Sequence, residues 1–459
     1  MTKWTISALA LSLGLAGCVN LAPEHQRPAA PVAPQWPALQ GAEVPGAQAA
    51  TQLQWQRFFN DARLAALIEL ALKNNRDLRV ALLNVDVARA QAGVAAANRW
   101  PTVGVGLNGT RQPDSSGEQK TTYQAGLQVT AYELDLFGKL RNTSDAAVAR
   151  TLASVEGARA ARISLIAAVA SSYLAWQADE ELVQLAQRTT ATRDDALKLM
   201  QLKFDNGAAS SLDLASAQSS LETARAALAQ AQRARAQDLN ALVLLVGQAL
   251  PQDLPPGQPL TAQQLAPVLA GLPSEVLVQR PDVLQAEQQL VAAAANIGAA
   301  RAAFFPSITL TTNFGSASSE LSELFKKTAW SVVGQALMPI FDAGRNRANL
   351  DAAKAQREIA VAQYEKTVQT AFREVADALA GRATLDEQLR AQQAQADAET
   401  RRLSLVDLRF RNGAASSLDL LDAQRASFAA EQAALQVRLA QLQNQVQLYK
   451  VLGGGLDKT

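Results

Sequence analysis

Four long stretches of the chain have the composition and the apolar spacing of helices. Residues 139–206 contain no proline and a single glycine, and one helix over these 68 positions would extend ~100 Å at ~1.5 Å per residue. Residues 344–413 repeat this composition, while 208–246 and 414–452 contain neither glycine nor proline. The pattern predicts four long helices arranged as two helical hairpins.

Shorter stretches alternate apolar and polar residues with a period of two, which predicts β-strands. In the first half of the chain the alternation covers 103–107 and 123–131, on either side of a turn-rich segment. In the second half, 308–312 is followed by a returning strand at 330–338. We therefore expect four strands in two β-hairpins, each strand close to the ~10 residues of a membrane strand.

The two halves of the chain carry one pattern, which indicates a tandem duplication. Leu202–Leu214 reads LKFDNGAASSLDL and Leu408–Leu420 reads LRFRNGAASSLDL, a shift of 206 positions. Pro101 and Pro306, each of which is expected to end an Ala-rich helix, lie 205 positions apart. Each half thus contributes one helical hairpin and one β-hairpin.

The predicted strands distinguish between two ways in which the long helices could pack, an antiparallel bundle and a tube shared by several chains. Apolar residues step by sevens from Leu421 to Tyr449, a seam that an ordinary antiparallel bundle would bury as well as a helical tube would. No stretch after the N-terminus has the ~18 uncharged apolar residues of a membrane helix, so any crossing is expected as strands. A strand edge left unpaired in hydrocarbon costs several kcal/mol per backbone group. Several copies must therefore share one barrel, and two or three copies both satisfy closure.

Composition and charge exclude several function classes. The formal net charge is +1, from 43 basic and 42 acidic residues, so the chain has no electrostatic footprint for nucleic acid. One histidine, His25, and one cysteine, Cys18, leave little from which to build a metal site or a catalytic pair, and no Gly-x-Ser-x-Gly elbow is present. We expect neither an enzyme nor a bound metal or cofactor.

The N-terminus predicts export and lipidation. A short apolar run follows a single basic residue and is too short to be a permanent membrane helix. The run ends in LAGC at 15–18, which resembles a bacterial lipobox, so Cys18 is expected to carry a covalent N-terminal lipid. Val19, rather than an aspartate, follows the cysteine, which by resemblance to other lipoproteins favours sorting to the outer membrane.

We divide the chain into five segments on these signals. They are a signal peptide (1–17), a lipid-anchored N-terminal arm (18–55), a first repeat (56–250), an equatorial connecting loop rich in Pro, Gly and Gln (251–273), and a second repeat with the C-terminus (274–459).

Further motifs make the chain resemble a known family over nearly its whole length. They are YELDLFGKLR at 132–141, QRPD at 279–282, ANIGAARAAFFPSI at 295–308, FREVADAL at 372–379 and LGGG at 452–455. With the lipobox, they resemble the TolC superfamily of outer-membrane efflux proteins, in its OprM-like lipoprotein branch.

The resemblance implies a mainly α fold with a membrane β part. Four long helices and four β-strands per chain would assemble as a homotrimer, in which a twelve-stranded β-barrel continues into a periplasmic α-helical barrel. The implied function is the exit duct of a tripartite pump, passing drugs or other small toxic compounds outward. The implied partners are a periplasmic membrane-fusion adaptor, an inner-membrane resistance-nodulation-division (RND) transporter and outer-membrane lipid. Metal-ion efflux or type I protein secretion is the alternative.

The turns of the two helical hairpins are the predicted adaptor contacts. An Asn-Gly pair ends each long helix, and both residue types tolerate the left-handed backbone that such turns use. Because the corresponding tips of the family meet the adaptor, the resemblance implies contacts at Asn206, Gly207, Ala208, Asn412, Gly413 and Ala414. Turn chemistry alone also accounts for these residues, and both roles can hold together.

Aspartates beside the turns are the predicted pore gate. Residues 418–423 match the family's Leu-Asp-x-Leu-Asp-Ala constriction, which implies gate roles for Asp419 and Asp422, and for Asp213 in the first repeat. In a trimer these carboxylates would form acidic rings that favour cations and raise one another's pKa. Capping-box spacing offers Asp213 and Asp419 a second role at a helix start, whereas Asp422 lies beyond the cap.

Two further expectations concern side chains near the gate and the strands. Some family members latch the gate with a tyrosine and an arginine, but Phe410 and Ala415 occupy the matching positions, which argues against a hydrogen-bonded latch of that form. Aromatic residues at helix-to-strand junctions and strand ends fit a membrane girdle, and core packing explains the phenylalanines equally well. They are Trp100, Tyr132, Phe304, Phe305 and Trp330.

Overall fold

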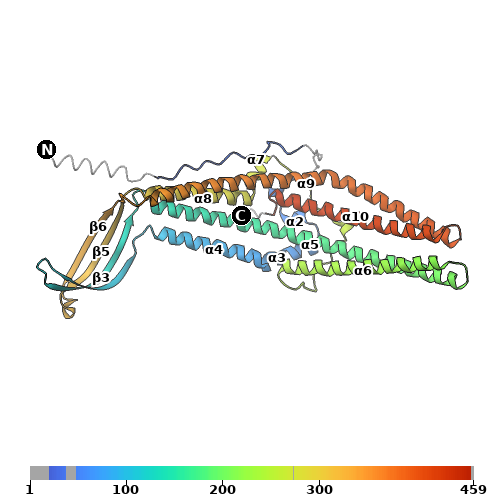
Figure 1. Cartoon of the computed structure of the whole chain (residues 1–459), viewed down its shortest axis with the longest axis horizontal. Coiled ribbons are helices and arrows are strands. Elements are labelled where there is room, and N and C mark those ends of the chain that lie inside the picture. The colour runs from blue at the N-terminus through green and yellow to red at the C-terminus, as the bar shows by residue number, and fades with distance from the viewer. Residues whose placement is uncertain (1–19, 38–47, 272, 456–459) are drawn as a thin grey trace. The chain divides into compact units, whose positions relative to one another are not determined.

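The computed structural model describes residues 20–37, 48–271 and 273–455 (Figure 1), and these fold into two compact units. Unit 1 comprises 20–29, 83–156 and 284–367, and unit 2 comprises the other described residues. Both units draw on both sequence repeats, so the compact units cut across the predicted segment boundaries. Cys18 and the signal peptide expected at 1–17 lie outside the described residues, and their roles stay predictions.

The strands of unit 1 form one antiparallel sheet in the order β2-β3-β5-β6. Their bounds are Val103–Pro113 for β2, Gln119–Leu134 for β3, Ser307–Ser318 for β5 and Thr328–Leu337 for β6. All four strands lie where the period-two alternation predicts them and continue beyond it at one end or both. In the described part of the chain, β2 and β6 each keep one edge without a hydrogen-bonded neighbour.

Two 22-residue helices precede the β-hairpins and end before the predicted prolines. These are α4 (Arg76–Ala97) and α8 (Pro281–Ala302). By length and composition alone α4 could cross a membrane, with 11% of its apolar window buried, but one such helix is weak evidence. Elsewhere in unit 1, alanines of α5 and α8 form a buried seam, which lets the two helices pack closely.

The four long helices are present as predicted. They are α5 (Lys139–Asp205), α6 (Ser211–Val246), α9 (Arg345–Arg411) and α10 (Ser417–Val451). With 67 residues each, α5 and α9 extend ~100 Å by the helical rise. Gly247 ends α6 with a φ of 77°, and a Cβ there would lie 2.5 Å from the carbonyl oxygen of Asn74.

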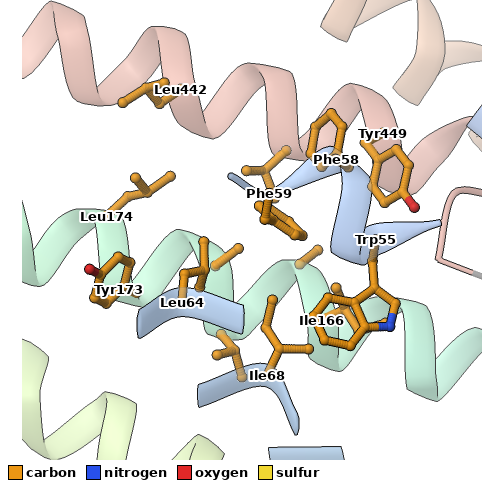
Figure 2. Close-up of a cluster of buried hydrophobic side chains, with 14 of the residues drawn as sticks. Trp55, Phe58, Phe59, Leu64, Ile68, Ile166, Tyr173, Leu174, Leu442 and Tyr449 are labelled. Atoms are coloured by element: carbon orange, nitrogen blue, oxygen red, sulfur yellow. The ribbon is translucent and has the colours of Figure 1, made fainter. Parts of the chain in front are cut away.

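The hydrophobic core of unit 2 gathers α2 (Trp55–Phe58) and α3 (Ala62–Asn74) against α5, α6 and α10 (Figure 2). The ring of Phe58 stacks on that of Tyr449, with centroids 4.0 Å apart and planes 7° apart. Leu64 and Ile68 of α3 are fully buried, and burial of each stabilises the fold by about 1.5–3 kcal/mol. This core fixes the α5–α6 hairpin and α10 to one another.

The predicted N-terminal arm and connecting loop contain short elements that pair with one another. Strand β1 (Gln48–Ala49) lies parallel to β4 (Val268–Leu269), a contact that the sequence pattern does not predict. The remaining short elements are η1 (Ala50–Gln52), η2 (Leu260–Ala262), α7 (Pro273–Val276), η3 (Leu277–Gln279) and η4 (Leu321–Glu323).

Candidate functional site

The two helical turns of unit 2 have the same backbone geometry. Gly207 and Gly413 have φ values of 73° and 74°, in the left-handed region where a side chain would be strained. The amide of Ala208 donates to the carbonyl of Lys203 at 2.7 Å, and that of Ala414 donates to Arg409 at 2.8 Å. These bonds close the ends of α5 and α9 as Schellman turns.

Both turns present small, open surfaces. A Cβ on either glycine would meet no atom within 4 Å. The amides of Asn206 and Asn412 fold back to donate to the carbonyls of Leu202 and Leu408, each at 2.7 Å. The predicted contact residues therefore lie together at two exposed turns, where backbone groups are accessible to a partner.

A capping box starts each helix after its turn. The hydroxyl of Ser210 accepts from the amide of Asp213 at 3.1 Å, and the carboxylate of Asp213 accepts from the Ser210 amide at 3.2 Å. Ser416 and Asp419 repeat the arrangement at 3.2 and 3.0 Å. The serine hydroxyl in each box is the main reason that the pKa of its aspartate lies below the usual value. Both aspartates are thus helix caps in this chain, whatever second role they have.

Asp422 lies one turn further along α10 and is paired with arginines. Its carboxylate forms a salt bridge with Arg402 of α9 and lies 3.8 Å from Arg425. Arg402 also contacts Glu399, at 3.0 Å. Within one chain the predicted acidic pair is therefore partly neutralised, and the pKa of Asp419 is lowered rather than raised.

The two turns are joined directly to each other. The hydroxyl of Ser417 donates to the carboxylate of Asp213, which links the start of α10 to the start of α6. The ammonium of Lys203 lies 4.1 Å from the centre of the Phe410 ring, a cation–π contact. Phe410 is 5% exposed and packs in a small cluster with Met200, Ala217 and Leu420, so an apolar contact occupies the place of a hydrogen-bonded latch.

Comparison with known proteins covers both repeats. The family model described as outer membrane efflux protein matches residues 67–248 and 272–454. The chain belongs to the outer membrane efflux protein family. It is 46% identical to the toluene efflux pump outer membrane protein TtgC of Pseudomonas putida, over 99% of this chain and 96% of that protein. It is 43% identical to the outer membrane protein OprJ of Pseudomonas aeruginosa, over 99% and 96%.

A solved structure of an outer membrane channel has the same fold as this efflux protein. The open state of the MtrE outer membrane channel of Neisseria gonorrhoeae superposes with a TM-score of 0.88 at 41% identity, covering 96% of this chain and 99% of that one. The family, the channel fold, the efflux function and the outer-membrane location predicted from the sequence are confirmed. The family consists of channel proteins rather than enzymes.

Two of the sequence motifs of this efflux protein, QRPD and FREVADAL, meet at one buried arginine beside a third, LGGG. Arg280, 7% exposed, donates to the carboxylates of Asp282 and Glu374 at 2.7 and 2.8 Å and to the carbonyl of Val451 at 3.0 Å. Burial alone would lower the pKa of Arg280, but the bonds to Asp282 and Glu374 outweigh it and raise that pKa. The QRPD motif thus has a structural role, because its arginine joins the start of α8 to α9 and to the end of α10.

Sequence reasoning did not predict a second buried polar group, at the start of α3. Asp61, 1% exposed, accepts from the hydroxyl of Tyr173 at 2.9 Å and from the amide of Gln258 in the connecting loop at 3.0 Å. It also caps α3 through the amides of Arg63 and Leu64. Only the N-cap could have been anticipated, because an aspartate here precedes an apolar helical run.

The predicted aromatic girdle divides into two kinds of residue. Trp100 and Trp330 are 75% and 73% exposed, as membrane-interface residues of a single chain would be. Phe305 instead stacks on Phe137 with centroids 4.6 Å apart, and the hydroxyl of Tyr132 donates to the carbonyl of Arg99.

Within the described ranges, no three His, Cys, Asp or Glu side chains come together as a group that could hold a metal ion.

Proposed function

We propose that this chain is the trimeric exit duct of a tripartite RND efflux pump that removes organic solvents and antibiotics. The observation that carries the proposal is the pair of matched helical turns, joined to each other and open to solvent, on a chain of the outer membrane efflux family. The relatives named for toluene and other efflux pumps support a small, apolar cargo.

The free strand edges support assembly from several chains. A four-stranded sheet with two open edges cannot close by itself, and unpaired backbone groups in hydrocarbon cost several kcal/mol each. Large apolar side chains share one face of the sheet by strand register: Val105 is 84% exposed, Phe314 62% and Val332 58%. Three copies would pool twelve strands into one barrel whose outer face is apolar.

The turns supply a landing surface for a periplasmic adaptor. Gly207, Ala208, Gly413 and Ala414 carry no bulky side chain, so a partner's helical hairpin can approach the backbone itself. Asn206 and Asn412 hold the turns from within and set their shape. Bulky substitutions at the glycines should block docking while the helices persist.

Asp422, with Asp419 and Asp213, forms the constriction in this proposal. The Arg402–Asp422 bridge joins α9 to α10, and the Ser417–Asp213 bond joins the two turns. Opening then requires these polar contacts to be exchanged for water, which is inexpensive for the exposed Arg402–Asp422 bridge and costs more for the partly buried Ser417–Asp213 bond. Asp422→Ala, alone or with Asp419→Ala, should raise the conductance in planar bilayers, and Arg402→Gln should do the same by removing the partner.

The cargo and the partners are tested together in cells. Deletion of the gene should raise sensitivity to toluene and to several unrelated antibiotics, and wild-type protein should restore resistance. A Gly413→Trp variant that reaches the outer membrane as a trimer should fail to restore it and should lose cross-linking to the adaptor. Unchanged drug sensitivity together with a defect for one metal would instead favour metal-ion efflux, and a defect in one secreted protein would favour type I secretion.

A further inference from the structure

An arginine in the interior of unit 2 has no counter-ion. Arg193 of α5 is 4% exposed, and within the described residues no carboxylate lies within salt-bridge distance of it. One of its terminal nitrogens donates to the carbonyl of Ser220 on α6 at 2.9 Å, while its Nε has no hydrogen-bond partner. A buried guanidinium normally requires a paired charge, because desolvating an isolated charge costs several kcal/mol.

Two further polar atoms on the neighbouring helices α6 and α10 are buried without a hydrogen-bond partner. They are the hydroxyl of Ser220 and the side-chain oxygen of Gln424. Gln424 itself is 5% exposed and lies on α10, in the second helical hairpin. Gln424 lines a cavity together with Arg193, but its free atom is an oxygen that accepts hydrogen bonds, so of these two side chains only Arg193 offers an unused donor there.

Two small cavities meet at Arg193. One has a volume of about 140 Å³ and is lined by α5, α6 and α10, and the other, of about 130 Å³, is lined by α5, α9 and α10. Arg193, Thr189 and Phe428 line both of them. Each cavity exceeds the ~30 Å³ that a water molecule occupies in the liquid, so each can hold a small ion together with water molecules.

The charged side chains around the cavities are mostly positive. Arg193 and Arg425 line the first cavity, and Arg188, Arg193 and Glu431 line the second. Glu431 accepts from the hydroxyl of Ser427 at 3.0 Å rather than from an arginine. Burial lowers the pKa of Arg193, and the like charge of Arg425 lowers it further.

We infer that these cavities form a binding site for a small inorganic anion, with chloride the natural occupant, held by Arg193 and shared with Arg425. A monovalent halide supplies the missing charge, accepts from the free Nε–H of Arg193, and fits the volume of the first cavity. The anion bridges α5 and α6 of one helical hairpin to α10 of the other. It lies about 20 Å from the turns, since Arg193 precedes Gly207 by fourteen residues.

Bromide and chloride titrations of the full-length purified protein in detergent test the inference. Crystals soaked in sodium bromide should show an anomalous peak against the Nε of Arg193. Replacing gluconate by chloride at constant ionic strength should raise the melting temperature along a saturable curve, as expected of a ligand bound to the native state. Absence of the peak, with equal melting temperatures in chloride and gluconate, overturns the site.

Matched variants separate a bound anion from general salt effects. Arg193→Met keeps the length of the side chain without its charge and should flatten the chloride curve, whereas Arg390→Met, at an exposed arginine paired with Glu387, should leave it unchanged. If Arg193→Met does not fold, Arg425→Gln replaces it in the test. This variant should move the midpoint of the chloride titration to a several-fold higher chloride concentration. A Glu431→Gln variant should bind chloride more tightly; if it alone gains a chloride response, Glu431 is the counter-ion and the inference is wrong. None of these readouts depends on transport or on the role of the turns.

Discussion

Two single substitutions distinguish the cap and gate roles of Asp419. Ser416→Ala removes the hydroxyl that accepts from the Asp419 amide and leaves the carboxylate charge in place. Asp419→Asn removes the charge and keeps an oxygen that can still accept from the Ser416 amide. A pure cap predicts that the first substitution matters more, whereas a charged constriction predicts the opposite for conduction.

The size of the cap effect follows from the bonds lost. Loss of a serine N-cap costs about 1 kcal/mol of helix stability, which is roughly a fivefold increase in opening of the first turn. Hydrogen exchange of the amides at the start of α10 should therefore quicken about fivefold in Ser416→Ala. Ser210→Ala should have a similar effect at the start of α6 and serves as the matched control in the other repeat.

Planar-bilayer recordings measure the gate role on the same variants. If the Asp419 charge acts in the pore, Asp419→Asn should reduce cation selectivity, while Ser416→Ala should keep it. Because the pKa of Asp419 lies below 3.8, the charge and the cap persist above that pH and are lost together as the pH falls through the lowered value. Equal selectivity in wild type and Asp419→Asn, or an equal loss in Ser416→Ala, would refute the charge role.

Four further substitutions, one of them a control, test the energetics of the helical region. Burial, and then the charge of Asp238, raise the pKa of Asp179 to about 6. The stability of the folded protein should therefore fall as the pH rises from 3.8 to 6, because the folded state holds this proton more tightly than the unfolded state. Asp179→Asn should flatten that slope in melting curves taken between about pH 4 and pH 7. Gly247→Ala should lower the unfolding free energy by about 2 kcal/mol, because the added methyl group meets both a left-handed backbone and a clash. Gly93→Ala, in open space within α4, is the control and should be neutral or stabilising. Denaturant titration measures both variants. Arg280→Met should cost about 3 kcal/mol and quicken amide exchange at the end of α10, an expectation that unchanged exchange there would contradict.

The long elements were predictable because local signals define them. Two Asn-Gly pairs mark the ends of α5 and α9, and period-two alternation marks strands such as β2. These signals act within a few residues of one another, so one sequence suffices to find them. The capping boxes at Asp213 and Asp419 were likewise readable from their spacing.

Contacts between distant segments were not predictable in the same way. Strands β1 and β4 have two residues each, too few for any period, and their pairing joins segments about 220 positions apart. The Ser417–Asp213 bond and the buried Arg193 depend on how one helical hairpin packs on the other. Such side chains look like ordinary helical polar residues until the packing is known, which is why the sequence offered no signal for the proposed anion site.

The duplicated turns agree in backbone but differ in electrostatics. Asp205, just before the first turn, corresponds to Arg411 before the second, so equivalent positions carry opposite charges. Each is held by a neighbour on its own helix, Gln201 for Asp205 and Asp407 for Arg411. In the proposed trimer the two kinds of turn would alternate around the ring, so a partner displaced by one hairpin would meet a different arrangement of charges at each step. Divergence of these two positions after duplication would therefore let a partner docked on the turns distinguish one hairpin from the other, and so set its rotation about the duct.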